Sequence, residues 1–285
     1  MILHKLRITL EMIKFEHTVF ALPFALIGAL LARKGLPAAW QTGWIVAAMV
    51  GARSAAMAFN RIADRHYDGL NPRTSGRALP AGNLSTGFAL AFTAAMSALF
   101  VFSAWRLNSL CFYLSFPTLA ILLSYSYTKR FTSLSHLVLG FSVGCAPLAA
   151  WLAVRGEFAL PPILLGAAVT FWVAGFDLIY ALQDIEFDRG ARLFSLPSRF
   201  GIGPALRVST LFHGATVILL GATAMLTNLG WLAFAGIAMV AGILYWEHRL
   251  VTPQDLSRIN VAFFNLNGYV SILLLLTFAG DILIR

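Results

Sequence analysis

The residues best suited to chemistry in this chain form two acidic clusters that lie far apart in the sequence. Asn60, Asp64 and Asp68 are spaced by four residues, so on a helix each lies about one turn beyond the last. Asp184 and Asp188 repeat this spacing after another apolar run. Because amide and carboxylate oxygens are the ligands that a hard divalent cation prefers, the two clusters are candidate Mg2+ sites.

The composition is that of an integral membrane protein. Of the 285 residues, 59% are hydrophobic and 12% are charged, whereas soluble domains carry about 25% charged residues. Repeated apolar runs have the length of membrane-spanning helices. We therefore expect an all-α, polytopic membrane protein in which residues 1–285 form a single domain. The nine predicted spans are residues 15–33, 43–62, 86–105, 107–127, 135–154, 160–183, 205–226, 230–247 and 260–283.

The basic residues predict how these spans are oriented. A formal net charge of +9 invites a nucleic-acid partner, but an excess of Lys and Arg is also typical of the cytoplasmic loops of membrane proteins. With the N-terminus in the cytoplasm, most of the 21 Lys and Arg residues fall on the cytoplasmic side. Both acidic clusters then lie on that side too. We predict a multi-pass protein of the inner, cytoplasmic membrane, with a cytoplasmic active site and no nucleic-acid partner.

Two ionisable residues lie deeper in the predicted spans than the clusters. Arg53 and Asp177 precede Asn60 and Asp184 by seven residues, which is about two helical turns. A charge at that depth is costly and normally faces a cavity or an opposite charge. The sequence therefore predicts either a substrate role for these residues or an Arg53–Asp177 pair that joins two spans.

The segments beside the clusters are rich in cations. Carboxylates combined with basic side chains suit a diphosphate, because a bound metal contacts phosphate oxygens and the cations take up the remaining charge. For any single loop arginine, membrane topology is an equally good explanation. The cations are Arg65, Arg73, Arg77, Lys129, Arg130, Arg189 and Arg199.

Aromatic residues also lie close to the clusters in sequence, among them Tyr125 and Tyr180. An aromatic belt at the membrane interface accounts for such residues. Aromatic faces also stabilise carbocations, and we favour that interpretation for Tyr180, one turn before Asp184.

The motifs at these positions resemble those of the UbiA superfamily of intramembrane prenyltransferases, and the resemblance covers nearly the whole chain. It is carried by Asn60-x3-Asp64-x3-Asp68 with Arg73-Thr74-x2-Arg77-x-Leu79-Pro80-x-Gly82, by Tyr125-x3-Lys129-Arg130-x-Thr132, and by Asp177-x2-Tyr180-x3-Asp184-x3-Asp188.

The resemblance implies about nine transmembrane helices around a central cavity that is capped on the cytoplasmic side and open laterally to the bilayer. It implies that Arg77, Lys129 and Arg130 bind the diphosphate of an isoprenyl substrate, with Tyr125 of the same motif as a further substrate-binding residue. The residues that would hold two Mg2+ ions on that diphosphate are Asn60, Asp64, Asp68, Asp184 and Asp188.

The expected reaction transfers a polyprenyl group from polyprenyl diphosphate to a hydroxylated aromatic carboxylate of the 4-hydroxybenzoate type, as in ubiquinone biosynthesis. The carbon–oxygen bond breaks toward an allylic cation, the electron-rich ring attacks that cation, and a proton is lost. Arg53 is the candidate partner of the acceptor's carboxylate. Asp177 is expected to orient the acceptor or to assist the loss of the proton.

Two departures from the family pattern leave the acceptor open. Arg61 follows Asn60 where much of the 4-hydroxybenzoate branch has Asp, and residues 192–197 lack the Lys often found just before Ser195. Both features resemble a branch linked to menaquinone synthesis, whose acceptor is 1,4-dihydroxy-6-naphthoate.

A membrane transporter is the alternative from another functional class. Intramembrane Arg53 and Asp177 are also compatible with a substrate or proton path. Transporters, however, seldom need two carboxylate clusters of the magnesium-binding type on one face, so the enzyme is the favoured interpretation.

Overall fold

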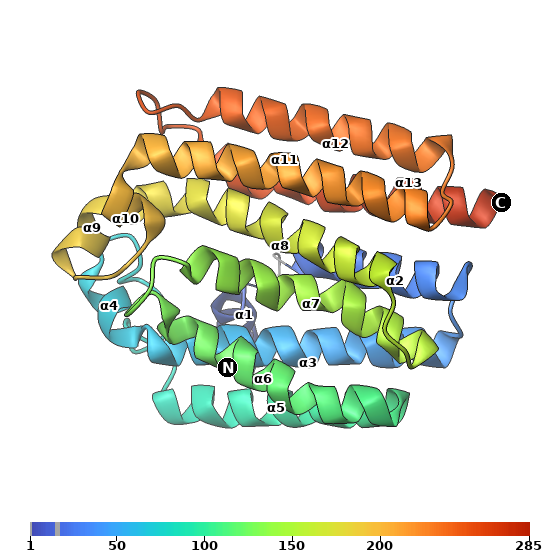
Figure 1. The fold of residues 1–285 in the computed structure, drawn as a ribbon. Helices are drawn as coiled ribbons and strands as arrows, with labels where there is room; N and C mark the ends of the chain where they lie inside the picture. The colour runs from blue at the N-terminus through green and yellow to red at the C-terminus, as the bar shows by residue number, and fades with distance from the viewer. Residues whose placement is uncertain (1, 15–17) are drawn as a thin grey trace. The chain divides into compact units, whose positions relative to one another are not determined.

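The computed structural model describes residues 2–14 and 18–285 (Figure 1). Over these ranges the chain is helical and contains no named strand, and its β pairing is an isolated bridge between Thr252 and Asp255. The prediction of an all-α fold is confirmed. Residues 15–17, where the first predicted span begins, lie outside the described residues.

The long helices follow the predicted spans closely. Eight helices in the described part of the chain are long and apolar enough to cross a membrane. They are α3 (Ala39–Ala63), α5 (Thr86–Leu107), α6 (Ser109–Thr128), α7 (Ser135–Arg155), α8 (Leu160–Ala181, continued to Gly190), α11 (Ile202–Leu226), α12 (Trp231–Leu250) and η3 (Val261–Leu266) with α13 (Asn267–Ile284). The first predicted span corresponds to the shorter apolar helix α2 (Thr18–Arg33), so a count of nine spans is not confirmed.

Five shorter helices complete the described part of the chain. They are α1 (Ile2–Met12), α4 (Arg65–Leu70), η2 (Leu182–Asp184), α9 (Ile185–Gly190) and α10 (Leu196–Phe200). Among them, α4, η2 and α9 carry Asp68, Asp184 and Asp188.

The chain divides into two compact units. The first comprises the described residues of 1–18 together with 43–127, and the second comprises 19–42 and 128–285. Residues 43–127 carry the Asn60 cluster, and residues 128–285 carry the Asp184 cluster. The assignment of the whole chain to one prenyltransferase domain stays a prediction.

Close helix packing in the first unit depends on a glycine. A Cβ atom at Gly51 on α3 would lie 2.8 Å from the backbone nitrogen of Phe100 on α5. Since real Cβ contacts are not that short, the glycine allows the two helices to approach one another. At the other end of α3, Ala58 packs with Met12 of α1 and with Leu79 in a buried apolar cluster. This cluster anchors the segment that follows the first acidic residues.

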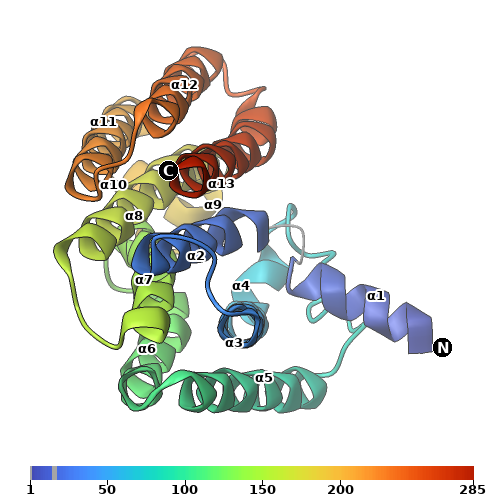
Figure 2. The same cartoon turned by 90° about the vertical axis from the view of Figure 1, so that its right-hand side faces the viewer.

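The second unit is organised around α8, the most deeply buried of the candidate spans. Gly144 on α7 faces Gly166 on α8, where an added Cβ would meet the Gly166 carbonyl oxygen at 2.4 Å. Small residues at such crossings let helix backbones pack closely within a membrane. On another side α8 packs against α11, and Figure 2 shows α12 next to α11 and α13 in the same unit. Helix α8 is therefore the rigid element that carries the second acidic cluster.

Candidate functional site

The first acidic segment is interrupted at its central carboxylate. Helix α3 ends at Ala63, Asp64 has φ −90° and ψ 0°, and α4 begins at Arg65. These angles lie in the sparsely allowed bridge region where many active-site residues occur. The amide of Asp64 still donates to the Asn60 carbonyl, and that of Asp68 to the Asp64 carbonyl, each at 2.8 Å. The predicted span ends at residue 62, close to the observed end of α3 at Ala63, and the four-residue spacing of the side chains is kept across the break.

The side chains of this segment contact one another directly. The amide nitrogen of Asn60 donates to Oδ2 of Asp64 at 2.9 Å. Arg77 donates from Nη1 to Oδ1 of Asp68 at 2.7 Å, and Arg61 Nη1 lies 3.9 Å from the second oxygen of Asp68. Asp64, Asp68 and Arg61 are all buried. Three predicted metal ligands, Asn60, Asp64 and Asp68, and one predicted diphosphate ligand, Arg77, thus take part in the contacts of this segment in the first unit.

Arg61 is a member of this cluster that sequence reasoning noted only as a departure from a family pattern. Its Nε donates to the backbone carbonyl of Met12 at 3.2 Å, which holds the guanidinium inside the unit. It interacts electrostatically with Asp64, Asp68, Arg77 and Tyr125. A buried cation beside two carboxylates reduces the repulsion between them. Its place in the sequence could have indicated this contact, because Arg61 directly follows Asn60 and the carboxylates of Asp64 and Asp68 lie about one and two helical turns later.

The first segment fits a divalent cation in the chemistry of its donors. Oδ2 of Asp68 is buried and accepts no hydrogen bond. A buried carboxylate oxygen without a hydrogen bond is costly, and a bound cation relieves that cost. Within the described part of the chain, neither unit by itself brings three His, Cys, Asp or Glu side chains into a metal-binding group. The carboxylates of one unit are therefore too few to hold a divalent cation alone, and further oxygen donors would have to complete a coordination shell.

The second acidic segment is also interrupted at a carboxylate. Helix α8 ends at Ala181, a 3-10 turn spans Leu182–Asp184, and α9 begins at Ile185. Asp184 has φ −107° and ψ 7°, close to the values at Asp64. The predicted span ends at residue 183, close to the observed end of α8. A change to tighter helical winding within a long helix often marks a functional position.

Asp188 lies at the centre of the contacts in this second segment. Its carboxyl is buried, is hydrogen-bonded to the Ser195 side chain, and interacts electrostatically with Lys129, Asp184 and His136. The Lys129 carbonyl accepts a hydrogen bond from the amide of Phe194 at 2.6 Å, which ties the two loops together. Two predicted metal ligands and one predicted diphosphate ligand are thus brought together in the second unit.

Asp177 has a partner that sequence reasoning missed. Nδ1 of His136, on α7, lies 2.7 Å from Oδ2 of Asp177 on α8. The imidazole is buried, whereas 23% of the Asp177 side chain is exposed. Nε2 of His136 is buried without a hydrogen-bond partner. The spacing of residues along the chain does not predict this pair, because the two residues come from different helices.

The other predicted residues are distributed between the two units. In the first, Nη2 of Arg53 donates to the Lys14 carbonyl at 3.1 Å, and the guanidinium is half-buried on α3. In the second, Arg130 follows Lys129 and is half-buried. The ring of Tyr180 stacks on Phe263, with ring centroids 4.1 Å apart and planes inclined by 27°. The predicted carbocation-stabilising role of Tyr180 stays a prediction.

Comparison with known proteins places the chain among enzymes of one family. Residues 21–269 match the model of the UbiA prenyltransferase family. The 4-hydroxybenzoate octaprenyltransferase of Klebsiella pneumoniae is 30% identical over 249 residues, which are 87% of this chain and 86% of that protein. The 4-hydroxybenzoate octaprenyltransferase of Nitrosospira multiformis is 32% identical over 258 residues, which are 90% and 88% of the two proteins.

Solved structures give the same result. The apo structure of a UbiA homolog from Aeropyrum pernix K1 has a TM-score of 0.85 and 39% sequence identity, over 94% of this chain and 98% of that one. A UbiA homolog from Archaeoglobus fulgidus, solved with GPP and Mg2+, has a TM-score of 0.67 over 94% and 99% of the two chains. At 18% identity, that second likeness shows the fold alone. The chain belongs to the UbiA prenyltransferase family and is an integral membrane prenyltransferase.

Proposed function

We propose that this protein transfers a polyprenyl group from polyprenyl diphosphate to a hydroxylated aromatic carboxylate of the 4-hydroxybenzoate type, releasing diphosphate in a Mg2+-dependent reaction. The observation that carries the proposal is the pair of helix interruptions at Asp64 and Asp184, each with carboxylates and basic side chains around it. The names of the relatives, 4-hydroxybenzoate octaprenyltransferases, support the donor and the acceptor.

The proposed ligands of the metal are the amide and carboxylates of the two segments. Bound Mg2+ would neutralise the diphosphate and make it a better leaving group. The proposed ligands are Asn60, Asp64, Asp68, Asp184 and Asp188. Among them, Asp68 supports the assignment most directly, since one of its buried oxygens accepts no hydrogen bond.

Basic side chains are proposed to bind the diphosphate itself. Arg77 is already oriented by its 2.7 Å contact with Asp68. Lys129 interacts electrostatically with Asp188, and Arg130 follows it in sequence. Tyr125 interacts with Arg61 and is proposed to contact substrate from the same side of the first cluster. Preorganised cations of this kind stabilise the charge that develops on a leaving group.

The acceptor is proposed to meet Arg53 and Asp177. A planar guanidinium suits a carboxylate, so Arg53 is assigned to the acceptor's carboxylate. His136 donates to one oxygen of Asp177, and the partial exposure of that side chain leaves a surface for the acceptor's hydroxyl. Asp177 then orients the phenol and assists proton loss, while Tyr180 stabilises the allylic cation.

A second candidate acceptor is 1,4-dihydroxy-6-naphthoate, for menaquinone synthesis. The observation that favours it is Arg61, whose buried guanidinium replaces an acidic residue typical of much of the 4-hydroxybenzoate branch. Both acceptors are hydroxylated aromatic carboxylates, so the role of Arg53 is the same for either.

The membrane placement is part of the proposal. We infer a multi-pass protein of the inner, cytoplasmic membrane, with the N-terminus and both acidic segments on the cytoplasmic side. The distribution of Lys and Arg supports this orientation. Cysteine labelling from outside intact cells tests it, since a cysteine introduced at Arg65 should stay unlabelled until the cells are opened.

The experiment that tests the function is an assay of the purified protein in detergent. It is incubated with polyprenyl diphosphate, Mg2+ and each acceptor in turn, and the prenylated product and free diphosphate are quantified. We expect product with one acceptor and none after removal of divalent cations by a chelator. A protein that releases no diphosphate under any of these conditions would contradict the enzyme and favour the transporter.

A further inference from the structure

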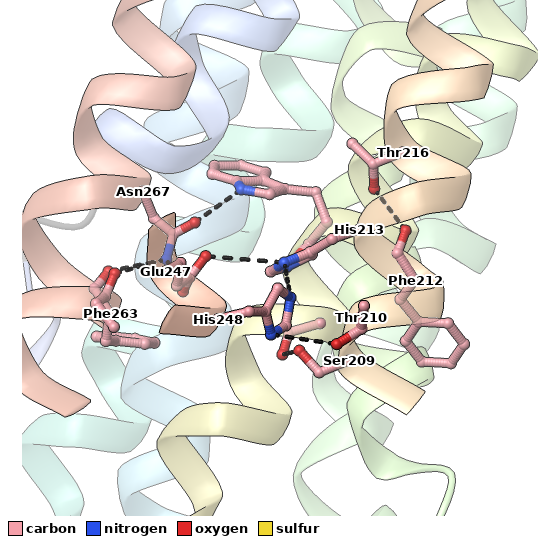
Figure 3. A network of polar contacts seen from close by, with 12 residues as sticks. Ser209, Thr210, Phe212, His213, Thr216, Glu247, His248, Phe263 and Asn267 are labelled. Carbon is pink, nitrogen blue, oxygen red and sulfur yellow. Dashed lines mark hydrogen bonds and ion pairs between the residues drawn. The ribbon is translucent and has the colours of Figure 1, made fainter. Parts of the chain in front are cut away.

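A buried polar network in the second unit takes no part in the proposed site (Figure 3). Its central residues, Glu247 on α12 and Asn267 at the start of α13, are both 0% exposed. A carboxyl and an amide inside membrane-spanning helices are costly unless their hydrogen bonds are made, and they commonly mark functional positions. The contacts of these two residues therefore show what the network holds in place.

The donors and acceptors around Asn267 determine how its amide is oriented. The indole N–H of Trp172 can only donate, and it reaches Oδ1 of Asn267 at 2.8 Å. The amide nitrogen therefore faces the other way and donates to Oε1 of Glu247 at 3.1 Å. Oε2 of Glu247 lies 3.8 Å from Nδ1 of His213, which is itself 2.9 Å from Nε2 of His248 (Figure 3). Glu247 is thus held by the hydrogen bond from Asn267 to Oε1, while its Oε2 is buried and makes no hydrogen bond.

The same amide nitrogen also closes an unusual helical turn. Residues Val261–Leu266 form the π-helix η3, directly before Asn267. Nδ2 of Asn267 lies 3.0 Å from the carbonyl oxygen of Ala262 and 3.3 Å from that of Phe263. A π turn replaces the regular bonding of an α-helix with bonds to amides five residues later, and its carbonyls can accept a further side-chain donor. Asn267 supplies that donor, so the amide and the π turn stabilise each other.

The π turn places an aromatic ring against a residue of the proposed site. Phe263 stacks on Tyr180 with ring centroids 4.1 Å apart, and Phe264 meets the same tyrosine edge-on at 6.2 Å. Tyr180 lies one helical turn before Asp184 on α8. A contact chain of residues in the second unit thus runs from Glu247 through Asn267 and Phe263 to Tyr180.

We propose that Asn267 and Glu247 are positioning residues for prenyl transfer, because they hold the π turn that supports the Tyr180 ring. This inference rests on the proposed function, in which Tyr180 faces the allylic cation. When the carbon–oxygen bond breaks, its electron pair leaves with diphosphate. The cation then takes an electron pair from the acceptor ring, which loses a proton, or from water, which loses a proton and gives the prenyl alcohol. A well-supported aromatic ring favours the acceptor by keeping water out.

The ratio of prenyl alcohol to prenylated product tests this role. It is measured on active molecules only, so it does not depend on how much protein is folded. We expect Asn267→Ala to raise the ratio about threefold to tenfold, the range that corresponds to loss of a stacked aromatic contact. Glu247→Ala should raise it less, and Glu247→Gln should restore it, since the Gln amide oxygen accepts from Asn267.

Two further variants make the test specific. Phe263→Leu keeps an apolar side chain but removes the ring, so it should raise the ratio as Asn267→Ala does. Combining the two changes should add nothing, because both act through one ring. The matched control is Thr223→Ala on α11, which removes a fully buried hydroxyl bonded within its own helix to Leu219 and should leave the ratio unchanged.

The outcomes separate this inference from the function on which it rests. A wild-type protein that forms neither prenylated product nor prenyl alcohol contradicts the function, and the inference falls with it. An active wild type whose ratio is unchanged by Asn267→Ala overturns the inference alone. If Asn267→Ala gives no folded protein, the comparison of Glu247→Ala with Glu247→Gln decides: unequal ratios support the inference and equal ratios overturn it.

Discussion

The two acidic segments end long helices in the same manner but balance their charges differently. Asp64 and Asp184 each interrupt a helix with nearly the same backbone angles, φ −90° and ψ 0° against φ −107° and ψ 7°. In the first segment, the carboxylates are matched by Arg61 and Arg77, both of which lie within 3.9 Å of Asp68. The first cluster is therefore neutralised largely by its own side chains.

The second segment balances its carboxylates with a hydroxyl as well as with basic groups. The buried carboxyl of Asp188 is held by the hydroxyl of Ser195, and the basic groups that interact with it are Lys129 and His136. Asp184 adds a second carboxylate to the same surroundings. A hydroxyl leaves the negative charge in place, whereas a guanidinium cancels it. We infer that the first segment keeps its geometry without a metal and that the second depends more strongly on a bound cation.

The largest expected effect is on catalysis, and it should be equal in the two segments. Asp64→Ala and Asp184→Ala each remove a proposed metal ligand, so turnover should fall by at least about a hundredfold, the scale for losing a group that stabilises transition-state charge. The measurement is product formation per inserted protein, with insertion checked by membrane fractionation. Full activity in either variant would refute the metal assignment for that segment.

A second prediction concerns stability and separates the segments. Arg77→Met leaves the buried Asp68 carboxylate with poorer compensation and should destabilise the protein by about 1–3 kcal/mol in the absence of Mg2+. Added Mg2+ should stabilise this variant more than the wild type, because a cation replaces the lost charge. Thermal unfolding in detergent, with and without Mg2+, measures both effects.

The matched change in the second segment is Lys129→Met. Asp188 keeps its hydrogen bond to Ser195 in this variant, so the stability without Mg2+ should fall less than in Arg77→Met. In the first segment, adding Asp68→Asn to the Arg77→Met variant should recover stability, because the uncompensated carboxylate is then gone. A larger loss from Lys129→Met than from Arg77→Met would reverse the proposed difference between the segments.

The sequence predicted both acidic segments and the course of most helices for identifiable reasons. Long apolar runs and their ends are local features, so α3, α5 and the later spans lie close to the predicted ranges. The spacing of Asn60, Asp64 and Asp68 gave the contacts within the first cluster. That spacing is the same whether the helix continues or breaks, so the interruption at Asp64 was not predictable from it.

Contacts between helices that are distant in sequence could not be predicted from the spacing of residues within one helix. The pairing of His136 with Asp177 joins two helices, and the position of neither residue in the sequence predicts it. The π turn before Asn267 depends on an amide, a carboxylate and an indole that come together only through packing. Arg61 was visible as an unusual residue, but its pairing with Asp68 required the fold of α4.

A third prediction uses the His136–Asp177 pair, which belongs to the second unit. His136→Leu removes the donor to Asp177 and should lower kcat/KM for the acceptor about tenfold to a hundredfold, as expected for a hydrogen bond to a charged group. His136→Asn retains a donor near the position of Nδ1 and should recover most of that loss. Steady-state kinetics with each substrate varied in turn provides the measurement.

The kinetic pattern distinguishes a positioning role from a general loss of structure. The effect of His136→Leu should appear in the acceptor parameters and leave the KM for polyprenyl diphosphate within about twofold, since the donor is bound by other residues. A variant that weakens both substrates equally would mean that the pair serves α7–α8 packing alone.

The smallest expected effect concerns the hydroxyl that supports the second segment. Ser195→Ala removes a hydrogen bond to Asp188 and the N-cap of α10, whose capping box pairs Ser195 with Ser198. The Mg2+ concentration for half-maximal activity should rise about twofold to tenfold, the range for the loss of one typical intramolecular hydrogen bond. Ser195→Thr keeps the hydroxyl and should behave as wild type.

The matched control for this change lies in the first segment, where Ser126 accepts a long 3.4 Å hydrogen bond from Asn60. Because arginines already balance the charge of that cluster, Ser126→Ala should shift the Mg2+ dependence less than Ser195→Ala does. Titration of activity with Mg2+ in the two variants compares the segments directly. Equal shifts would mean that the first cluster depends on the metal as strongly as the second, in spite of its arginines.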